Sequence, residues 1–382
     1  MTTAPQGFVT FPVTLPKSAL KQMVAFVRAL ERVVALPAYR QQVTAQLPEA
    51  AQFEHGHGSV MMGYDFHLTE EGPRLIEINT NAGGGLFAYR AHYPEFEGRH
   101  FNKGNPHEPT PHQQERLVAT FRQEWQRFQQ AAGQVERPLG RIVVMDENPE
   151  AQFLYPEMQS FGQLFEHFGI EALVAGPEEL TMDRQGVHYL GQRVDLLYMR
   201  HCDFYLDTPE LAGLRAAYLN RTICLTPNPR IYGLMADKRR LITLCSAEQT
   251  TALGAEAEDA ELLSHIIPTC KGLWDLADED ALWAERKQWV FKPVASHGSR
   301  GVVLGRSMRR NRFAELDRPT TLLQRLVPPS TTECEGVEKP MKTDFRLFAY
   351  GTRILGVTAR LYSGQVTNFK DPQSGYAAVN VV

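Results

Sequence analysis

The N-terminal part of the chain combines helical and strand patterns. Between residues 16 and 48, apolar side chains recur at spacings of three and four, which predicts amphipathic helices. Residues 59–68 and 74–80 read as two strands on either side of a turn-forming stretch, so we expect a hairpin. Residues 113–132 are polar over the length of a helix and predict a surface helix.

A different pattern begins at residue 141. Short apolar runs alternate with a helical segment over 150–168, which is typical of a small α/β unit with a parallel sheet; the strands are expected at 141–145, 171–175 and 194–199. After a helix over 231–246 the pattern favours strands, expected at 288–294, 302–304 and 321–327. Two C-terminal hairpins are predicted to turn at Gly351-Thr352 and Ser363-Gly364. The fold class predicted is α/β (α+β).

Composition narrows the function classes. The 382 residues are 43 % hydrophobic and 22 % charged, and the net charge of −4 gives no basic field for nucleic acid. No apolar run reaches the ~18 residues of a membrane span, and the start lacks the pattern of a secretory signal. The five dispersed cysteines fit reduced thiols. We therefore expect a cytoplasmic protein with small-molecule partners, neither nucleic acid nor membrane; its oligomeric state stays open, with a homodimer as one option.

The first hairpin carries a group of oxygen ligands. Glu77 and Asn79 share one strand face, and pairing Leu68 with Arg74 across a five-residue turn would place Asp65 opposite Glu77. Opposed carboxylates repel unless a cation lies between them, and hard oxygen ligands suit Mg²⁺ or Mn²⁺. The alternative is an ordinary solvated polar face.

A second candidate site follows the strand at 288–294. Lys292 lies near the strand end, and the next loop contains small residues whose backbone N–H groups suit phosphate oxygens: Ser296, Gly298, Ser299 and Gly301. Neither a P-loop nor a dinucleotide fingerprint is present, and a plain β-turn is the alternative.

The C-terminal hairpins supply further cations. Pairing Tyr350 with Arg353 places Lys342, Asp344 and Arg346 on one strand face, which favours a sheet over a wet cleft. In the second hairpin Asn368 is expected to pair with Ala359 and to share the face of Arg346. Arg360 falls on the opposite face in this ideal register, so either a bulge intervenes or Arg360 is structural.

Two smaller motifs remain ambiguous. Asp237-Lys238 opens a predicted helix and by itself indicates only a surface charge pair. Glu54-His55-Gly56-His57 is either a plain polar loop or part of a transition-metal site.

In their order along the chain, these clusters resemble the ATP-grasp superfamily in a circularly permuted form, as in glutathionylspermidine synthase and eukaryotic glutathione synthetase. The C-terminal half supplies Asp237-Lys238, Lys292-Pro293 with its loop, a hinge at 324–326, Asp344-Phe345-Arg346, Arg360 and Asn368. Gly63-Tyr64-Asp65 and Glu77-Ile78-Asn79, which usually come last, stand at the N-terminus. Joining residue 382 to residue 1 restores the usual order.

The resemblance implies a domain organisation. Residues 1–100 would form the N-terminal part of a permuted ATP-grasp domain, 101–139 a connector and helix, and 140–230 an α/β pre-ATP-grasp domain. Residues 231–382 would form the ATP-binding part, with the glycine loop as a lid.

The resemblance also implies an ATP-dependent carboxylate-amine ligase that works through an acyl phosphate. Asp65, Glu77 and Asn79 would hold Mg²⁺ (or Mn²⁺) on the ATP phosphates, and Lys238, Lys292 and the Ser/Gly loop would contact those phosphates. Arg346 would stabilise transition-state charge with Arg360 and Asn368 behind it, and Gln324, Arg325 and Leu326 would hold adenine through their backbone.

The sequence also departs from the family. Arg325 stands where an acidic residue is common in the hinge, which argues against a side-chain contact to adenine there. Gly63 stands where glutathionylspermidine synthase has an arginine, so the substrate cannot be carried over. A phosphotransferase and a non-catalytic nucleotide-binding module remain alternatives; a dehydrogenase is disfavoured because no glycine fingerprint follows Val144.

Overall fold

A large sheet joins the two ends of the sequence in the computed structural model, which describes residues 7–9, 12–92, 111–294, 301–334, 339–365 and 374–382. Within those residues its order is β1-β19-β18-β17-β3-β4, and β16 also pairs with β17. The strands are β1 (Gly7–Phe8), β3 (Met62–Thr69), β4 (Gly72–Asn79), β16 (Ser330–Thr332), β17 (Met341–Tyr350), β18 (Arg353–Tyr362) and β19 (Gly375–Ala377). The N-terminal hairpin β3-β4 therefore continues the C-terminal hairpin β17-β18 through the antiparallel pair β3-β17.

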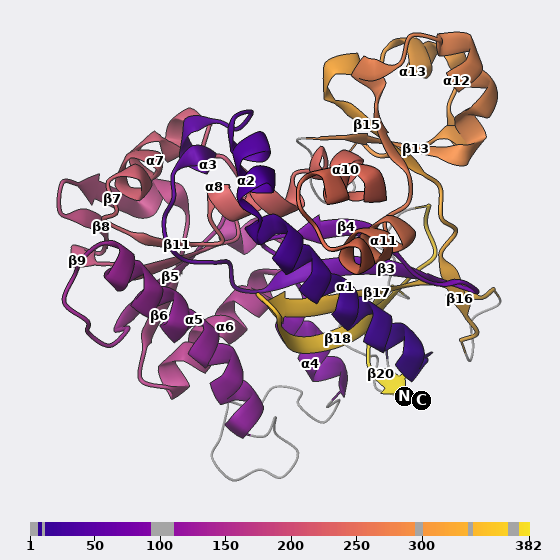
Figure 1. Ribbon diagram of the computed structural model, residues 1–382. Helices are drawn as coiled ribbons and strands as arrows, with labels where there is room; N and C mark the ends of the chain where they lie inside the picture. Colours follow the sequence, from indigo (N-terminus) through magenta and orange to yellow (C-terminus); the bar gives the residue numbers. More distant parts are fainter. Residues whose placement is uncertain (1–6, 10–11, 93–110, 295–300, 335–338, 366–373) are drawn as a thin grey trace.

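The chain ends lie side by side at one edge of this sheet (Figure 1). Strands β2 (Val13–Leu15) and β20 (Val379–Val381) pair in parallel, and the N–H of Lys17 donates to the carbonyl of Val382 at 2.6 Å. Helix α1 (Lys17–Ala35) packs on the sheet through Phe26. Its ring forms T-shaped contacts with the rings of Tyr64 and Phe66, with ring centroids 6.4 and 5.7 Å apart.

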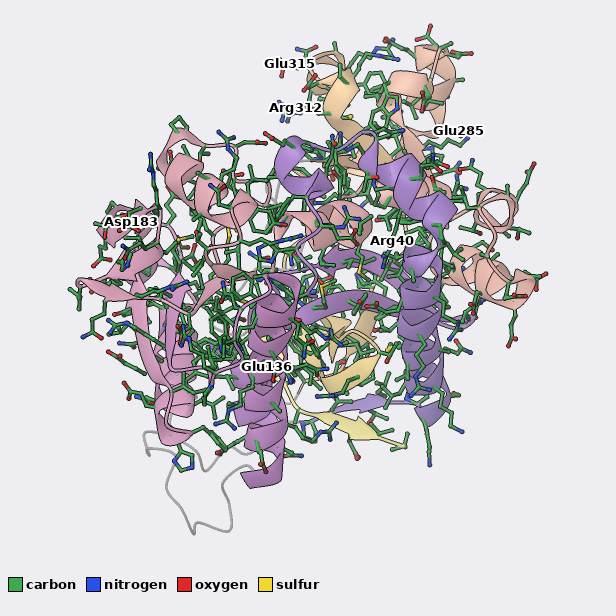
Figure 2. The ribbon with its side chains drawn as sticks, turned by 60° about the vertical axis from the view of Figure 1, so that its left-hand side comes forward. Arg40, Glu136, Asp183, Glu285, Arg312 and Glu315 are labelled. Atoms are coloured by element: carbon green, nitrogen blue, oxygen red, sulfur yellow. The ribbon has the colours of Figure 1, made fainter. Side chains whose placement is uncertain are left out.

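A parallel sheet forms the second unit, as predicted. Its order is β11-β10-β5-β6, from β5 (Arg141–Met145), β6 (Glu171–Ala175), β10 (Leu196–Met199) and β11 (Cys224–Thr226). The pattern missed β11 and the antiparallel ribbon of β7 (Leu180–Asp183), β8 (Gly186–Tyr189) and β9 (Gln192–Arg193). Charged side chains such as Asp183 project from this ribbon at the surface (Figure 2).

The helix predicted at 113–132 is present as α5 (Pro111–Ala131), but it is not exposed on all sides as the prediction of a surface helix implied. Phe121, Trp125 and Phe128 are buried and pack, with α6 (Tyr155–His167), against the parallel sheet. Arg122, Gln126 and Arg127 lie on the exposed face of the helix, whereas Glu124 is buried, so the polar composition suggested a more exposed element than the one present.

A small antiparallel sheet forms a separate lobe (Figure 1). Its order is β12-β15-β13-β14, from β12 (Cys270–Gly272), β13 (Trp289–Pro293), β14 (Val303–Leu304) and β15 (Thr321–Arg325). Phe291, Leu323 and Phe313 form its own core together with helices α12 (Glu279–Glu285) and α13 (Arg310–Ala314).

The remaining helices are short. They are α2 (Pro37–Thr44), α3 (Glu49–Gln52), α4 (Gly85–His92), α7 (Ala212–Leu219), α8 (Pro229–Ile231), α9 (Arg240–Leu244), α10 (Ala247–Ala252) and α11 (Ala257–Ile266). The helix expected over 231–246 is broken: a π-helical turn, Tyr232–Ala236, precedes α9, and Asp237 and Lys238 lie at the break. No helix in the described part of the chain has the length and apolar character needed to cross a bilayer.

Two β-bulges change the predicted registers. In the first hairpin Thr69 pairs with Gly72 across a two-residue turn, and the extra residue Ile76 restores the predicted pair of Asp65 with Glu77. In the second, Tyr350 pairs with Arg353 as predicted, and the bulge lies between Phe348 and Ala349.

The strand pairing predicted for the hairpin that turns at Ser363-Gly364 is wrong. Ala359 pairs with Ala377 of β19 rather than with Asn368, and Asn368 lies outside the described residues. The strand next to β18 is therefore formed by a later segment than expected.

Candidate active site

A cavity of about 440 Å³ lies between the large sheet and the small antiparallel sheet. It brings together ten of the residues singled out in the sequence: Asp65, Glu77, Asn79, Lys238, Lys292, Gln324, Arg325, Leu326, Arg346 and Arg360. Gly301 is described but does not line the cavity, and Ser296, Gly298, Ser299 and Asn368 lie outside the described residues. The cavity thus joins segments that lie almost 300 residues apart in the sequence.

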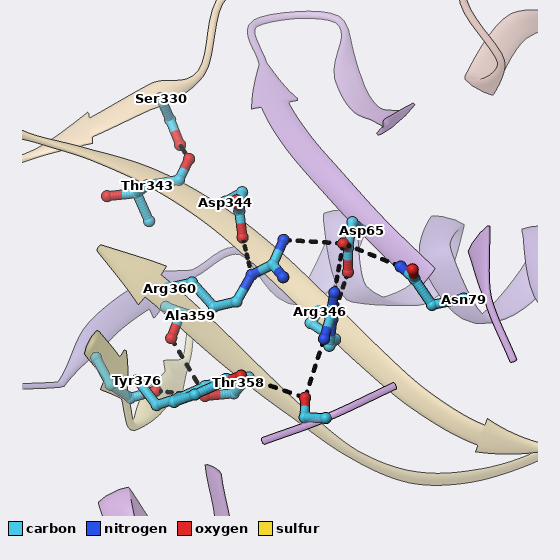
Figure 3. Close-up of polar contacts among 12 residues, drawn as sticks. Asp65, Asn79, Ser330, Thr343, Asp344, Arg346, Thr358, Ala359, Arg360 and Tyr376 are labelled. Atoms are coloured by element: carbon cyan, nitrogen blue, oxygen red, sulfur yellow. Dashed lines mark hydrogen bonds and ion pairs between the residues drawn. The ribbon is translucent and has the colours of Figure 1, made fainter. Parts of the chain in front are cut away.

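Asp65 is the centre of a buried charge network (Figure 3). The Nε and Nη2 atoms of Arg346 donate to its two carboxylate oxygens at 2.6 and 2.7 Å, and Nη2 of Arg360 lies 2.9 Å from Oδ2. Burial raises the pKa of Asp65, but the two guanidinium groups outweigh it and hold this pKa at about 2. Asp65 is therefore a permanent anion that fixes both arginines.

The β-bulge in the second hairpin settles the placement of Arg360. Because β18 contains one extra residue, Asp344 pairs with Arg360, which then lies on the same face as Arg346. Its Nε atom donates to Asp344 at 2.5 Å. The sequence allowed either a bulge in this hairpin or a structural role for Arg360, and the structure contains the bulge.

A bulge also shapes the surroundings of Lys292. The Nζ atom of this side chain donates to the carbonyl of Ile76, the bulged residue of β4, at 2.9 Å, and to Oε1 of Gln324 at 2.5 Å. Burial lowers the pKa of Lys292, while the nearby Glu77 raises it. The lysine is therefore held at the junction of the two sheets before any ligand arrives.

Glu77 and Lys238 form an ion pair in the wall of the cavity, with Oε1 and Nζ 3.2 Å apart. The break before α9 is held by Asp237, which accepts hydrogen bonds from Tyr205 and from Arg239. Lys238 therefore lines the cavity, and the buried Asp237 holds the break from which it comes, so the two are not only a surface pair.

The proposed metal ligands differ in what surrounds them. Among the described residues, no group of three or more His, Cys, Asp and Glu side chains is arranged to hold a metal ion. Asp65 already binds two arginines, and Asn79 turns its amide nitrogen to Asp65 at 3.4 Å. Glu77, whose side chain is 24 % exposed, and the amide oxygen of Asn79 still fit Mg²⁺, which often uses one carboxylate together with phosphate oxygens.

The hinge differs from the adenine contact that the resemblance implied. The N–H of Arg325 donates to Thr269 and that of Leu326 to Gln288, both at 2.8 Å, so the small sheet already uses these two donors. Val327, the next residue, lines the cavity and accepts a hydrogen bond from Nδ1 of His67. The apolar side chains around it provide a surface for a flat ring: Val290, Val302, Leu304, Leu326, Pro328 and Pro329.

The clustered glycines at 81–85, which by their type allow close backbone approach to a ligand, contain one residue that supports the site. Gly83 accepts hydrogen bonds through its carbonyl from Arg346 at 2.9 Å and from the hydroxyl of Tyr376 at 3.2 Å. The sequence reasoning missed Tyr376 and two residues that line the cavity, His67 and Arg306, and no sequence signal pointed to them.

Cations outnumber carboxylates in the cavity. Among the described residues, its lining contains seven lysine and arginine side chains (Lys238, Lys292, Arg306, Arg325, Lys342, Arg346 and Arg360) and three carboxylates (Asp65, Glu77 and Asp344). The four excess positive charges indicate an anionic ligand, because a cavity lined by one sign of charge attracts the other.

Known structures provide an independent comparison of the fold. No protein-family model and no curated protein sequence matches the chain. A glutathione synthetase-like effector from Globodera pallida superposes with a TM-score of 0.62 at 12 % identity, covering 99 % of this chain and 90 % of the other. A protein from Methylobacillus flagellatus KT, provisionally named a gamma-glutamylcysteine synthetase, gives a TM-score of 0.52 at 12 % identity, covering 94 % and 86 %.

The chain has an α+β fold, which it shares with both of these proteins. This confirms the predicted fold class, α/β (α+β). At 12 % identity the likeness concerns the fold alone, so the chemistry of the cavity has to be argued from its own residues.

Proposed function

We propose that this protein is an ATP-dependent ligase that joins a carboxylate to an amine. The observation that carries the proposal is the meeting of ten residues, selected beforehand from the sequence, around one cavity with excess positive charge. We further propose that the chain is a circularly permuted ATP-grasp enzyme, because β3-β4 from its start and β17-β18 from its end complete one sheet.

The positive side chains would hold the triphosphate. Lys238 comes from the break before α9 and Lys292 from β13, and both lie near Glu77 on one side of the cavity. Fixed cations of this kind stabilise charge that develops on a transferred phosphoryl group. Glu77 and Asn79 would hold Mg²⁺, which supplies charge neutralisation between phosphate oxygens when bound. The apolar wall around Val327 would hold the adenine ring.

The proposed reaction has two steps. A substrate carboxylate oxygen attacks the γ-phosphorus, the bond to the bridging oxygen breaks, and ADP leaves. The amine nitrogen then attacks the acyl carbon, phosphate leaves, and the surplus proton of the amine passes to solvent. Arg346 lies at the base of the cavity, where its guanidinium, fixed by Asp65 and Gly83, would stabilise the negative charge of both transition states.

Glu77→Gln is the first test of this function. We expect release of ADP and phosphate from Mg-ATP in the presence of pooled amino acids, polyamines and small peptides, and a loss of at least about 100-fold in turnover in the variant, since it loses a charge on which the phosphoryl step depends. Glu71→Gln, an exposed glutamate in the turn of the same hairpin, is the matched control and should retain full turnover. ADP release with a phosphorylated product but no amide would indicate a phosphotransferase. Equal turnover in all three proteins would contradict the role of Glu77.

A further inference from the structure

Two of the five free cysteines meet beside the candidate active site. Cys245 follows α9 and Cys270 opens β12. The N–H of Cys270 donates to the sulfur of Cys245 at 3.3 Å, and the Cys245 thiol donates to the carbonyl of Cys270 at 3.8 Å. Because the Cys245 sulfur already contacts the backbone of Cys270, a disulfide between the two residues needs only local adjustment of their side chains.

The two thiols are chemically different. Cys245 is half-buried, and its hydrogen bond with Cys270 lowers its pKa to about 7, so a large fraction is thiolate at neutral pH. Cys270 is 4 % exposed, and burial raises its pKa. A reachable thiolate beside a protected thiol is the arrangement in which the first sulfur is oxidised and the second resolves it.

Cys270 is also connected to the proposed nucleotide site. It pairs with Gln324 across β12 and β15, so the two side chains lie next to each other on one face of this sheet. Gln324 in turn accepts the hydrogen bond from Nζ of Lys292. A change at the Cys270 sulfur therefore reaches Lys292 through one intervening side chain.

We propose that Cys245 and Cys270 form a peroxide-sensitive dithiol whose oxidation to a disulfide weakens nucleotide binding. The Cys245 thiolate attacks hydrogen peroxide, the O–O bond breaks, and a sulfenic acid and hydroxide form; the hydroxide takes a proton from solvent and becomes water. The Cys270 sulfur then attacks the Cys245 sulfur, the S–O bond breaks, and a second water leaves. The sulfurs lose two electrons to the peroxide. The effect on nucleotide rests on the proposed function, whereas the disulfide does not.

The test treats the reduced protein with hydrogen peroxide and follows two readouts. Non-reducing peptide mass spectrometry should show a 245–270 crosslink with a loss of about 2 Da, which dithiothreitol reverses. Calorimetry with Mg-ATP should show binding weakened about tenfold after oxidation, as expected when a hydrogen bond to a charged group is disturbed. Cys245→Ser and Cys270→Ser should form no crosslink, and Cys202→Ser, which removes another half-buried thiol, should behave like the natural chain.

The outcomes separate the two proposals. Absence of the crosslink in folded, peroxide-treated protein would overturn the inference whether or not nucleotide binds. A crosslink with unchanged Mg-ATP affinity would overturn the coupling to Lys292. A crosslink in a protein that binds no nucleotide in either redox state would support the dithiol and overturn the proposed function.

Discussion

Asp65 shows how far residue types alone can be interpreted. The sequence correctly placed it opposite Glu77, and a cation between opposed carboxylates was the expected consequence. In the structure the cations at Asp65 are the guanidinium groups of Arg346 and Arg360. These side chains come from strands about 280 residues away, so no local pattern could show that they would reach this carboxylate first.

His55 gives a prediction at the same scale. In the loop that looked either polar or metal-binding the two histidines are buried, and the His55 ring stacks on Tyr218 and on Phe128, with ring centroids 4.5 and 5.4 Å away. Burial lowers its pKa from 6.5 to about 2. The unfolded chain therefore binds one more proton than the folded one below pH 6.5, and stability is lost as the pH falls through that value.

Replacing His55 by phenylalanine should remove this pH dependence. At about 1.4 kcal/mol per pH unit, His55 should cost the natural protein about 2 kcal/mol of unfolding free energy between pH 7.5 and pH 5. Urea denaturation at the two pH values should show that His55→Phe loses about 2 kcal/mol less than the natural chain. His167→Phe, at the end of α6, is the control. Equal losses in the natural chain and His55→Phe would show that His55 is protonated in the folded state.

At the scale of elements, the turn that pairs Tyr350 with Arg353 was predictable, whereas the pairings at the other two predicted turns, and the bulges, were not. Turn residues placed Tyr350 against Arg353, and counting from that pair put Arg360 on the wrong face. The extra residues in β4 and β18 have ordinary side chains, and a bulge is stabilised by its partners rather than by its own residue type. In β4, one such partner is Lys292, which binds the carbonyl that the bulge exposes.

The turn before α4 makes a second prediction. Gly84 has φ +88°, its N–H donates to Glu157 at 2.9 Å, and an added Cβ would lie 2.0 Å from the Tyr376 ring. Gly191 has φ +73° and open space around it, so its replacement by alanine measures the free-energy cost of the backbone conformation alone. Gly191→Ala should lower the unfolding free energy by about 1 kcal/mol and Gly84→Ala by about 3 kcal/mol, because only the second also displaces a packed ring.

Urea denaturation of both glycine variants measures the difference. Gly84→Ala should also weaken Mg-ATP binding, since Tyr376 and Arg346 share the Gly83 carbonyl. Similar losses of stability in the two variants would show that the contact with Tyr376 relaxes without cost.

At the scale of the whole molecule, the adjacent chain ends are the main feature. Residues 13–15 pair with 379–381, so the first and last segments belong to one structural unit. This pairing fits the motif order, in which joining residue 382 to residue 1 restores the usual order of the family that the sequence resembles. The positions of the small lobe and the parallel sheet depend on packing between distant segments, which the sequence pattern does not encode locally.

A rearranged chain tests the proposed permutation. Linking the old ends and opening the chain between Val135, which is 90 % exposed, and Glu136 would start the protein with the parallel-sheet unit. This permutant should fold with a Tm within about 10 °C of the natural chain, because the cut removes few buried contacts. A control opened between Leu347 and Phe348, within β17, should not fold. Failure of the first permutant, observed by circular dichroism and thermal unfolding, would contradict the proposal.

The central claim is that the cavity between the two sheets binds Mg-ATP, and calorimetric titration of the natural chain tests it most directly. We predict one nucleotide site per chain, weakened at least about tenfold by Lys292→Met, which removes a buried charge. Lys271→Met, on the exposed face of β12, should leave the affinity unchanged. No heat of binding to the folded natural chain, or equal affinities of the natural chain and Lys292→Met, would contradict the account.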